Sequence, residues 1–250
     1  MKGKIILSTI LVSVMSLSVF AGWFIQESYR EEDQPKRRLF YIQNNRFKVV
    51  EKDFTSIVDV EKGILYFVNN SKKVYWKGTP AELKKEIDNF KNAMMKEMMK
   101  NLPPEQREAM KKEFEKKSPI PKVKIVKTSE KSVIANYPAV KYKVFANNEL
   151  KEEIWLSSKI KIGKEINTKK FASLMKDMNK ATEGTGSYEA NLEYQSLIFT
   201  GFPLKTVEYT EYGIRSSEAT LVEQKNFSSS EFEIPASYKE VSLAEFFKGR

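Results

Sequence analysis

The 250-residue sequence contains no cysteine and no histidine. These absences exclude disulfides, Ser-His-Asp and Cys-His catalytic sites, zinc sites built on those ligands, and covalent haem attachment. Glycine and proline are scarce as well, with 10 and 9 residues, which excludes collagen-like and linker-rich chains. Because only carboxylates, lysines, tyrosines and hydroxyls remain for chemistry, we expect a protein that is not an enzyme and that carries no metal and no cofactor.

The N-terminus has the pattern of an export signal. Lys2 and Lys4 precede a mostly apolar stretch at 5–19, and small residues at Val19 and Ala21 suit a signal peptidase. The alternative is a membrane anchor, but fifteen helical residues rise only about 22 Å, against about 30 Å for the hydrocarbon core. We therefore expect a signal peptide at 1–21 and a mature protein in the periplasm or secreted. Lipid attachment is not expected, because no cysteine follows Ala21.

Positive charge is unevenly distributed along the chain. The formal net charge is +10; residues 36–77 hold ten basic and four acidic residues, and residues 122–161 hold nine and four. Residues 162–250 hold eleven and thirteen. The basic excess predicts attraction to an anionic membrane surface or an acidic envelope protein, or it is simply the solvated face of a sheet. No nucleic-acid-binding motif is present, so we expect no nucleic-acid partner.

Residues 22–78 alternate between apolar and polar with period two, which is typical of strands. Expected strands at 38–42, 46–50, 54–60, 64–68 and 74–76 are separated by turn-forming residues such as Asn44-Asn45 and Asn69-Asn70. The spacing of about ten residues predicts an antiparallel meander.

A helical insert is expected at 79–118. Thr79, Pro80 and Glu82 form a helix start, and the apolar residues that follow are spaced 4-3-4-4: Leu83, Ile87, Phe90, Met94 and Met98. Pro103-Pro104 ends this helix, and a second, weaker helix is expected from about 104 to 117.

Strand character returns at 123–126, 132–134, 140–144 and 153–156, with Asn147-Asn148 as a hairpin turn. Asn167 is expected to cap a helix that ends at Gly184-Thr185-Gly186, and a short helix is expected near 187–197. A last hairpin is expected to pair 205–210 with 215–224, before a short helix at 243–247.

All seven methionines outside the expected signal peptide lie in expected helices. Met94, Met95, Met98 and Met99 cover more than one helical stripe. Methionine is flexible and adapts to apolar partners of variable shape. One interpretation is an adaptable lid over an apolar cleft that receives an acyl chain or an apolar peptide; the other is ordinary gap-filling between helix and sheet.

The order of elements resembles a known superfamily. The likeness is carried by several short segments across nearly the whole mature chain: 41–47, 64–68, 74–76, 136–137, 141–144, 153–157, 201–204 and 232–235. The chain resembles the lipoprotein-localisation-factor-like superfamily, the periplasmic carriers of outer-membrane lipoproteins. It looks closest to a related family of uncharacterised exported domains.

The resemblance implies an α+β fold in which a curved, unclosed antiparallel sheet, a half-barrel, has helices packed on its concave side. It implies one carrier-like domain at 22–250 that includes the 79–118 insert. In the carriers the hollow receives acyl chains, and an arginine beside the first hairpin matters for the lid; Arg46 is the matching position. The candidate ligand-binding residues are accordingly Phe90, Met94, Met95, Met98, Met99, Tyr142, Met175, Met178 and Arg46.

The sequence therefore predicts an exported, non-enzymatic binding protein that holds a lipid or another apolar ligand between a curved sheet and Met-rich helices. Burial of a chain of about fourteen carbons would contribute on the order of 10 kcal/mol gross, at about 0.8 kcal/mol per methylene. The alternative is a cell-envelope interaction or structural module that docks a partner through the helical insert.

Overall fold

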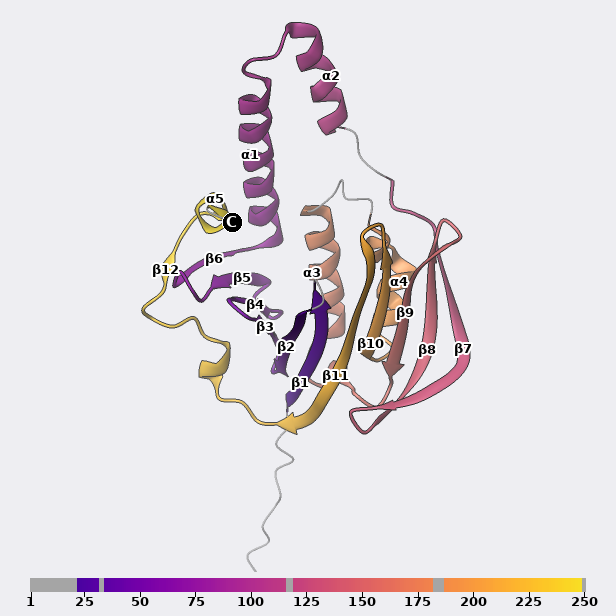
Figure 1. Cartoon of the computed structure of the whole chain (residues 1–250). Helices are drawn as coiled ribbons and strands as arrows, with labels where there is room; N and C mark the ends of the chain where they lie inside the picture. The colour runs from indigo at the N-terminus through magenta and orange to yellow at the C-terminus, as the bar shows by residue number, and fades with distance from the viewer. Residues whose placement is uncertain (1–21, 32–33, 116–118, 182–186, 249–250) are drawn as a thin grey trace, which may run out of the picture.

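The computed structural model describes residues 22–31, 34–115, 119–181 and 187–248. The expected signal peptide at 1–21 and the Gly184-Thr185-Gly186 turn lie outside the described residues. Within them the protein is α+β, with one sheet of 12 strands and five α-helices. The curved sheet stays open, and Figure 1 shows helices on its inner side. The fold class expected from the sequence is confirmed.

The N-terminal half of the sheet is the predicted meander. Each strand pairs antiparallel with the next along the chain. Asn44 and Asn45 adopt positive φ at the first tight turn, a conformation that asparagine tolerates well. The strands are β1 (Gly22–Glu31), β2 (Gln34–Gln43), β3 (Arg46–Glu51), β4 (Phe54–Asp59), β5 (Ile64–Asn69) and β6 (Val74–Gly78).

The C-terminal half contains three more hairpins and three α-helices. The weak strands expected at 123–126 and 132–134 are one strand with an irregularity between Lys127 and Lys131. The strands of the C-terminal half are β7 (Val123–Ile134), β8 (Tyr137–Ala146), β9 (Glu149–Ser157), β10 (Phe202–Thr210), β11 (Gly213–Lys225) and the short β12 (Lys239–Glu240). The α-helices are α3 (Thr168–Ala181), α4 (Leu192–Ile198) and α5 (Leu243–Phe247).

Strand β1 joins the two halves, because it pairs with β2 on one side and with β11 on the other. The complete order is β12-β6-β5-β4-β3-β2-β1-β11-β10-β9-β8-β7. The first and last of these strands form the edges of the described sheet, so the sheet does not close on itself.

The main core lies between the inner face of the sheet and the helices. Alternate residues of the strands face inward, as the strand period of two requires. Trp23 and Ile25 of β1 are buried there, with Leu174 of α3 and Phe246 of α5. A second cluster packs α4 against β8 and β9 through Leu197, Val144, Ile154 and Leu156.

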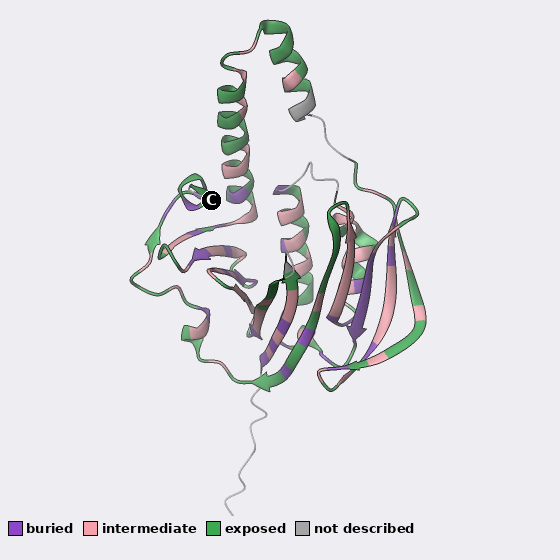
Figure 2. Cartoon of the chain, in the orientation of Figure 1, coloured by how far each residue is buried: buried purple, intermediate pink, exposed green. Residues whose placement is uncertain are grey.

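The insert forms an arm of two helices, α1 (Pro80–Met99) and α2 (Pro104–Glu115), which we call the arm. In Figure 1 the arm extends beyond the sheet, and in Figure 2 most of its length is exposed. None of the helices that the structure describes has the length and apolar character needed to cross a membrane.

Candidate functional site

The base of the arm is fixed to the body. Thr79 caps α1 with a reciprocal capping box: its hydroxyl accepts from the Glu82 N–H, and the Glu82 carboxylate accepts from the Thr79 N–H at 2.7 Å. Leu83 is the buried residue of α1, and Ile87 packs against the main core. The Glu86 carboxylate accepts from the Leu243 N–H at 3.1 Å, which ties α1 to the start of α5. The arm is therefore held in a defined direction.

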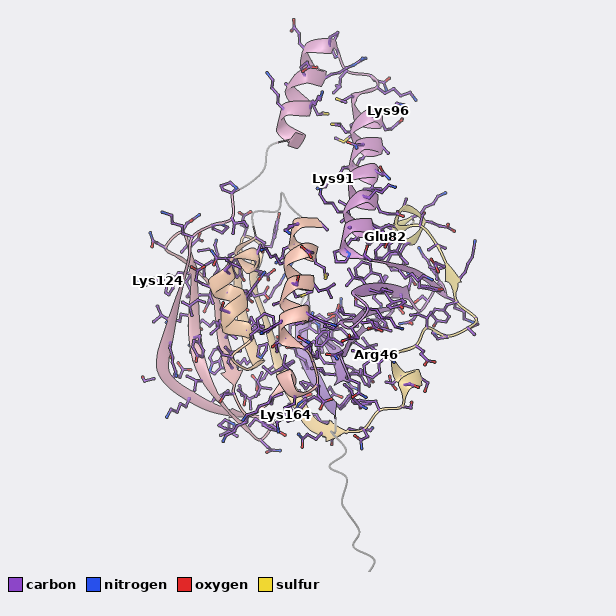
Figure 3. The ribbon with its side chains drawn as sticks, turned by 180° about the vertical axis from the view of Figure 1, so that it is seen from behind. Arg46, Glu82, Lys91, Lys96, Lys124 and Lys164 are labelled. Atoms are coloured by element: carbon purple, nitrogen blue, oxygen red, sulfur yellow. The ribbon has the colours of Figure 1, made fainter. Side chains whose placement is uncertain are left out.

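Beyond this base, α1 carries an apolar stripe that is open to solvent. Phe90, Met94 and Met98 are 50%, 42% and 48% exposed, and their spacing of four residues places them along one line of the helix. Met95 and Met99 are half-buried, on the neighbouring line. Lys91 and Lys96 extend from the same part of the helix in Figure 3. We call Phe90, Met94 and Met98 the arm stripe.

The other predicted ligand residues lie in different places. Met178 of α3 packs against the main core, and Met175 is half-buried on the same helix. Tyr142 of β8 packs against the second cluster, with the Lys127 ammonium 6.0 Å from its ring centroid. The helices α1 and α3 are in contact, and the three residues of the arm stripe are exposed. The structure therefore does not gather the nine candidates around one hollow.

Arg46 lies at the start of β3, on the body and far from the arm in Figure 3. Its Nε is 3.8 Å from Oδ2 of Asp59, directly across the β3–β4 pair. Asp59 is buried, and its other oxygen accepts from the Lys62 N–H. Arg46 thus neutralises a buried carboxylate.

The inner face also carries a polar region that the sequence did not reveal. Arg38 of β2 donates from Nη1 to Glu27 at 3.1 Å and from Nε to Glu51, and its guanidinium lies 4.9 Å from the Tyr29 ring centroid. Burial raises the pKa of the Glu27 carboxyl above its usual value. A cavity of about 800 Å³ opens beside Arg38, between β1–β3 and the β10–β11 hairpin.

A second group of polar side chains surrounds Glu152 of β9, which is 2% exposed. The Tyr188 hydroxyl donates to its carboxylate at 3.3 Å, and Tyr194 bonds to it as well. Burial, with the nearby charges of Glu208 and Glu189, raises the pKa of Glu152 to about 8. Among the described residues, no carboxylates are grouped so as to hold a metal ion.

These polar groups have only faint signals in the sequence. Arg38, Glu27 and Glu51 come from three strands, and alternation alone does not tell an inner face from an outer one. The pairing of β1 with β11 brings the two halves of the cavity together, and nothing local in the sequence specifies that pairing.

The model of one protein family covers residues 85–238, described as a domain of unknown function, DUF4412. The match extends over 154 of the 250 residues, from α1 to the C-terminal tail. The chain belongs to the DUF4412 family. No curated protein matches this DUF4412 chain.

Solved structures share only a loose likeness with this DUF4412 protein. A structure of PNGF-II is 12% identical, covers 90% of this chain and 32% of its own length, and has a TM-score of 0.41. A structure of MucB is 12% identical, with coverage of 87% and 58% and a TM-score of 0.39. The Pseudomonas aeruginosa MucA/MucB complex gives 11% identity, coverage of 89% and 59%, and a TM-score of 0.39. The chain thus spans about a third to three fifths of these proteins, and neither function nor partner transfers at this level of similarity.

Proposed function

We propose that this protein is a non-enzymatic, exported binding protein that docks another protein through the arm stripe. The observation that carries this proposal is the exposure of Phe90, Met94 and Met98 on a helix fixed at its base and extended beyond the sheet. Large apolar side chains in a row on a projecting helix are typical of surfaces that become buried on binding.

The arrangement fits one mode of protein recognition. A helix that enters an apolar groove uses anchor residues on one face at spacings of three and four. Phe90, Met94 and Met98 supply three such anchors within the 20 residues of α1, which rises about 30 Å. Burial of each anchor contributes about 1.5–3 kcal/mol before the ordering costs of association.

The chemistry of the partner follows from two features. The methionines favour a groove of apolar and adaptable shape. The formal net charge is +10, or +8 without Lys2 and Lys4 of the expected signal peptide, and it favours an acidic partner because opposite charge accelerates encounter and excludes wrong partners. We therefore assign to the partner an acidic surface around an apolar groove.

The lipid-binding interpretation remains a prediction with different requirements. It needs an apolar hollow. The cavity beside Arg38 is lined mostly by polar groups, whereas a second cavity, of about 600 Å³, lies between the start of α1 and α3 beside Pro80 and Leu174. It also needs the Met-rich helix over that hollow, whereas the part of α1 that lines the second cavity is its base, Pro80, Ala81 and Lys84, and not its methionines.

Native mass spectrometry of protein released gently from cells tests the proposal. We expect a discrete protein adduct with the natural chain, and loss of that adduct in the Met94→Lys/Met98→Lys variant. Lys91→Gln/Lys96→Gln changes the same stretch of helix without altering the stripe and without adding a negative charge that an acidic partner would repel, and it serves as the matched control. A retained lipid mass with no protein adduct would contradict docking and support the carrier interpretation.

A further inference from the structure

The cavity beside Arg38 is lined by residues of β1–β3 and of the β10–β11 hairpin, and by none of the arm. Residues 38 and 40 of β2 are two apart and share a face, and Phe40 packs against the main core. The volume of about 800 Å³ falls within the range of small-molecule sites, roughly 300–1,000 Å³. Its lining includes Tyr29, Arg38, Glu51, Thr206, Glu208 and Arg215.

The polar groups of the cavity are held in place before any ligand arrives. The Arg38 guanidinium is fixed between the carboxylates of Glu27 and Glu51. The hydroxyls of Thr206 and Ser217 bond to each other at 2.8 Å across the β10–β11 pair. Groups fixed in this way lose little conformational entropy on binding, which favours a ligand that presents many hydrogen-bonding groups.

The charges of the lining are balanced, and this excludes several ligand classes. Arg30, Arg38 and Arg215 stand against Glu51 and Glu208, with Glu27 directly behind Arg38. An anion would meet two carboxylates, and a cation would meet three guanidinium groups. An acyl chain would displace the water that hydrogen-bonds to these charged groups and would offer no hydrogen bonds in its place, so its binding would be unfavourable.

A neutral, polyhydroxylated ligand avoids all three penalties. Its hydroxyls accept from guanidinium groups and donate to carboxylates. Tyr29 and Tyr212 add aromatic rings to the lining, and an aromatic ring packs against the apolar C–H face of a sugar while its hydroxyl stays in water. Tyr212 is 92% exposed at the tip of the β10–β11 hairpin, at the rim of the cavity.

We propose that this cavity binds a neutral oligosaccharide. The site is separate from the arm stripe and does not depend on the docking function. One protein would then join a saccharide site on its inner face to a protein-docking arm, an arrangement suited to a component that connects an envelope glycan with an envelope protein.

Saturation-transfer NMR and calorimetry on the full mature chain test this proposal. The probes are maltotetraose, cellotetraose and tetra-N-acetylchitotetraose, with inorganic phosphate and decanoate as charged and apolar comparisons. We expect at least one tetrasaccharide to bind and the two comparison ligands not to. Glu208→Gln and Arg215→Ala are expected to weaken binding about tenfold, since each leaves a ligand hydroxyl without its charged partner.

Two further variants keep the experiment decisive. Glu218→Gln lies on the same hairpin but on the opposite face, where Glu218 pairs with Lys205, and it is expected to leave binding unchanged. Tyr212→Ala changes an exposed tip residue that the fold does not need, and it is expected to weaken binding as well. Binding by none of the three tetrasaccharides, equal loss in Glu218→Gln, or preference for phosphate or decanoate would each overturn the proposal.

Discussion

Glu152 has surroundings that are unusual for a glutamate, with a side chain that is almost completely buried. Its carboxyl is buried on β9 beside two tyrosines and faces the charges of Glu208 on β10 and of Glu189 in the 3-10 turn Tyr188–Ala190. Burial also raises the pKa values of Tyr188 and Tyr194, so both phenols stay protonated and donate hydrogen bonds. Since the pKa of Glu152 is about 8, the folded protein keeps its proton at neutral pH.

This protonation gives the stability of the fold a defined pH dependence. The pKa of Glu152 is raised on folding, so the folded state holds a proton that the unfolded state releases above about pH 4.5. Stability therefore falls as pH rises from about 4.5 to about 8, with a slope of at most about 1.4 kcal/mol per pH unit. Glu152→Gln should flatten this slope and be relatively most stabilising above pH 8. Urea unfolding midpoints measured at several pH values check this, and parallel curves for both proteins would contradict it.

Individual residues were predictable where the local backbone decides their role. Asn44-Asn45 and Asn147-Asn148 were predicted as turns, and all four adopt positive φ. Asn167 was predicted as a cap, and its side chain accepts from the Lys170 N–H. Glu152 was not predictable, because a glutamate in an alternating strand has the same sequence signal whether helix α4 covers it or water does.

At the scale of elements, α1 divides into a structural base and an exposed stripe. Leu83 and Ile87 belong to the core, whereas Phe90, Met94 and Met98 are open to solvent. The 4-3-4-4 pattern runs through both parts without a break. Sequence periodicity therefore predicted the helix and its apolar face, but it could not tell where the covering layer ends.

This division predicts a large effect on stability at the base of α1 and almost none at the arm stripe. Leu83→Ala should lower the free energy of unfolding by about 2–5 kcal/mol, because it removes a buried side chain and leaves a cavity. Met94→Lys and Met98→Lys should change it by less than about 0.5 kcal/mol, because exposed positions carry little packing. Chemical denaturation of the three variants measures this. A large loss of stability in either lysine variant would mean that the stripe packs within the protein.

The capping box predicts a smaller and local effect. Thr79→Ala removes the hydroxyl that accepts from the Glu82 N–H, and such a loss costs about 1 kcal/mol. Hydrogen exchange should quicken in the first turn of α1, with exchange in β1 unchanged. Unchanged protection at residues 80–83 would show that the core contact of Leu83 alone fixes the helix start.

At the scale of the whole molecule, the pairing of β1 with β11 decides the shape. It joins residues about 190 positions apart, as in the bond from the Gln26 side chain to Thr220. The meander and the hairpins were predictable from local patterns. The long-range pairing of β1 with β11 was not predictable from local patterns. The open, curved sheet depends on that pairing, so it was expected only from the resemblance to the lipoprotein-localisation-factor-like superfamily.

The same architecture predicts a wide range of local stabilities. Amides of β1 and β11 lie at the centre of the sheet and should exchange only through global unfolding. Amides of α2 and the outer turns of α1 have few buried contacts and should exchange much faster. Exchange followed by mass spectrometry measures both groups in one experiment, and uniform protection across arm and sheet would contradict the separation of the two.

The most direct test of docking by the arm stripe is photo-crosslinking in living cells from single positions on α1. A photoreactive phenylalanine at Met94 points along the stripe, and the same group at Lys96, two residues on, points to the opposite side of the helix. We expect one discrete protein adduct from position 94, absent from position 96 and lost when Met98→Lys is added. Equal adducts from both positions, or crosslinks to lipid alone from position 94, would contradict it.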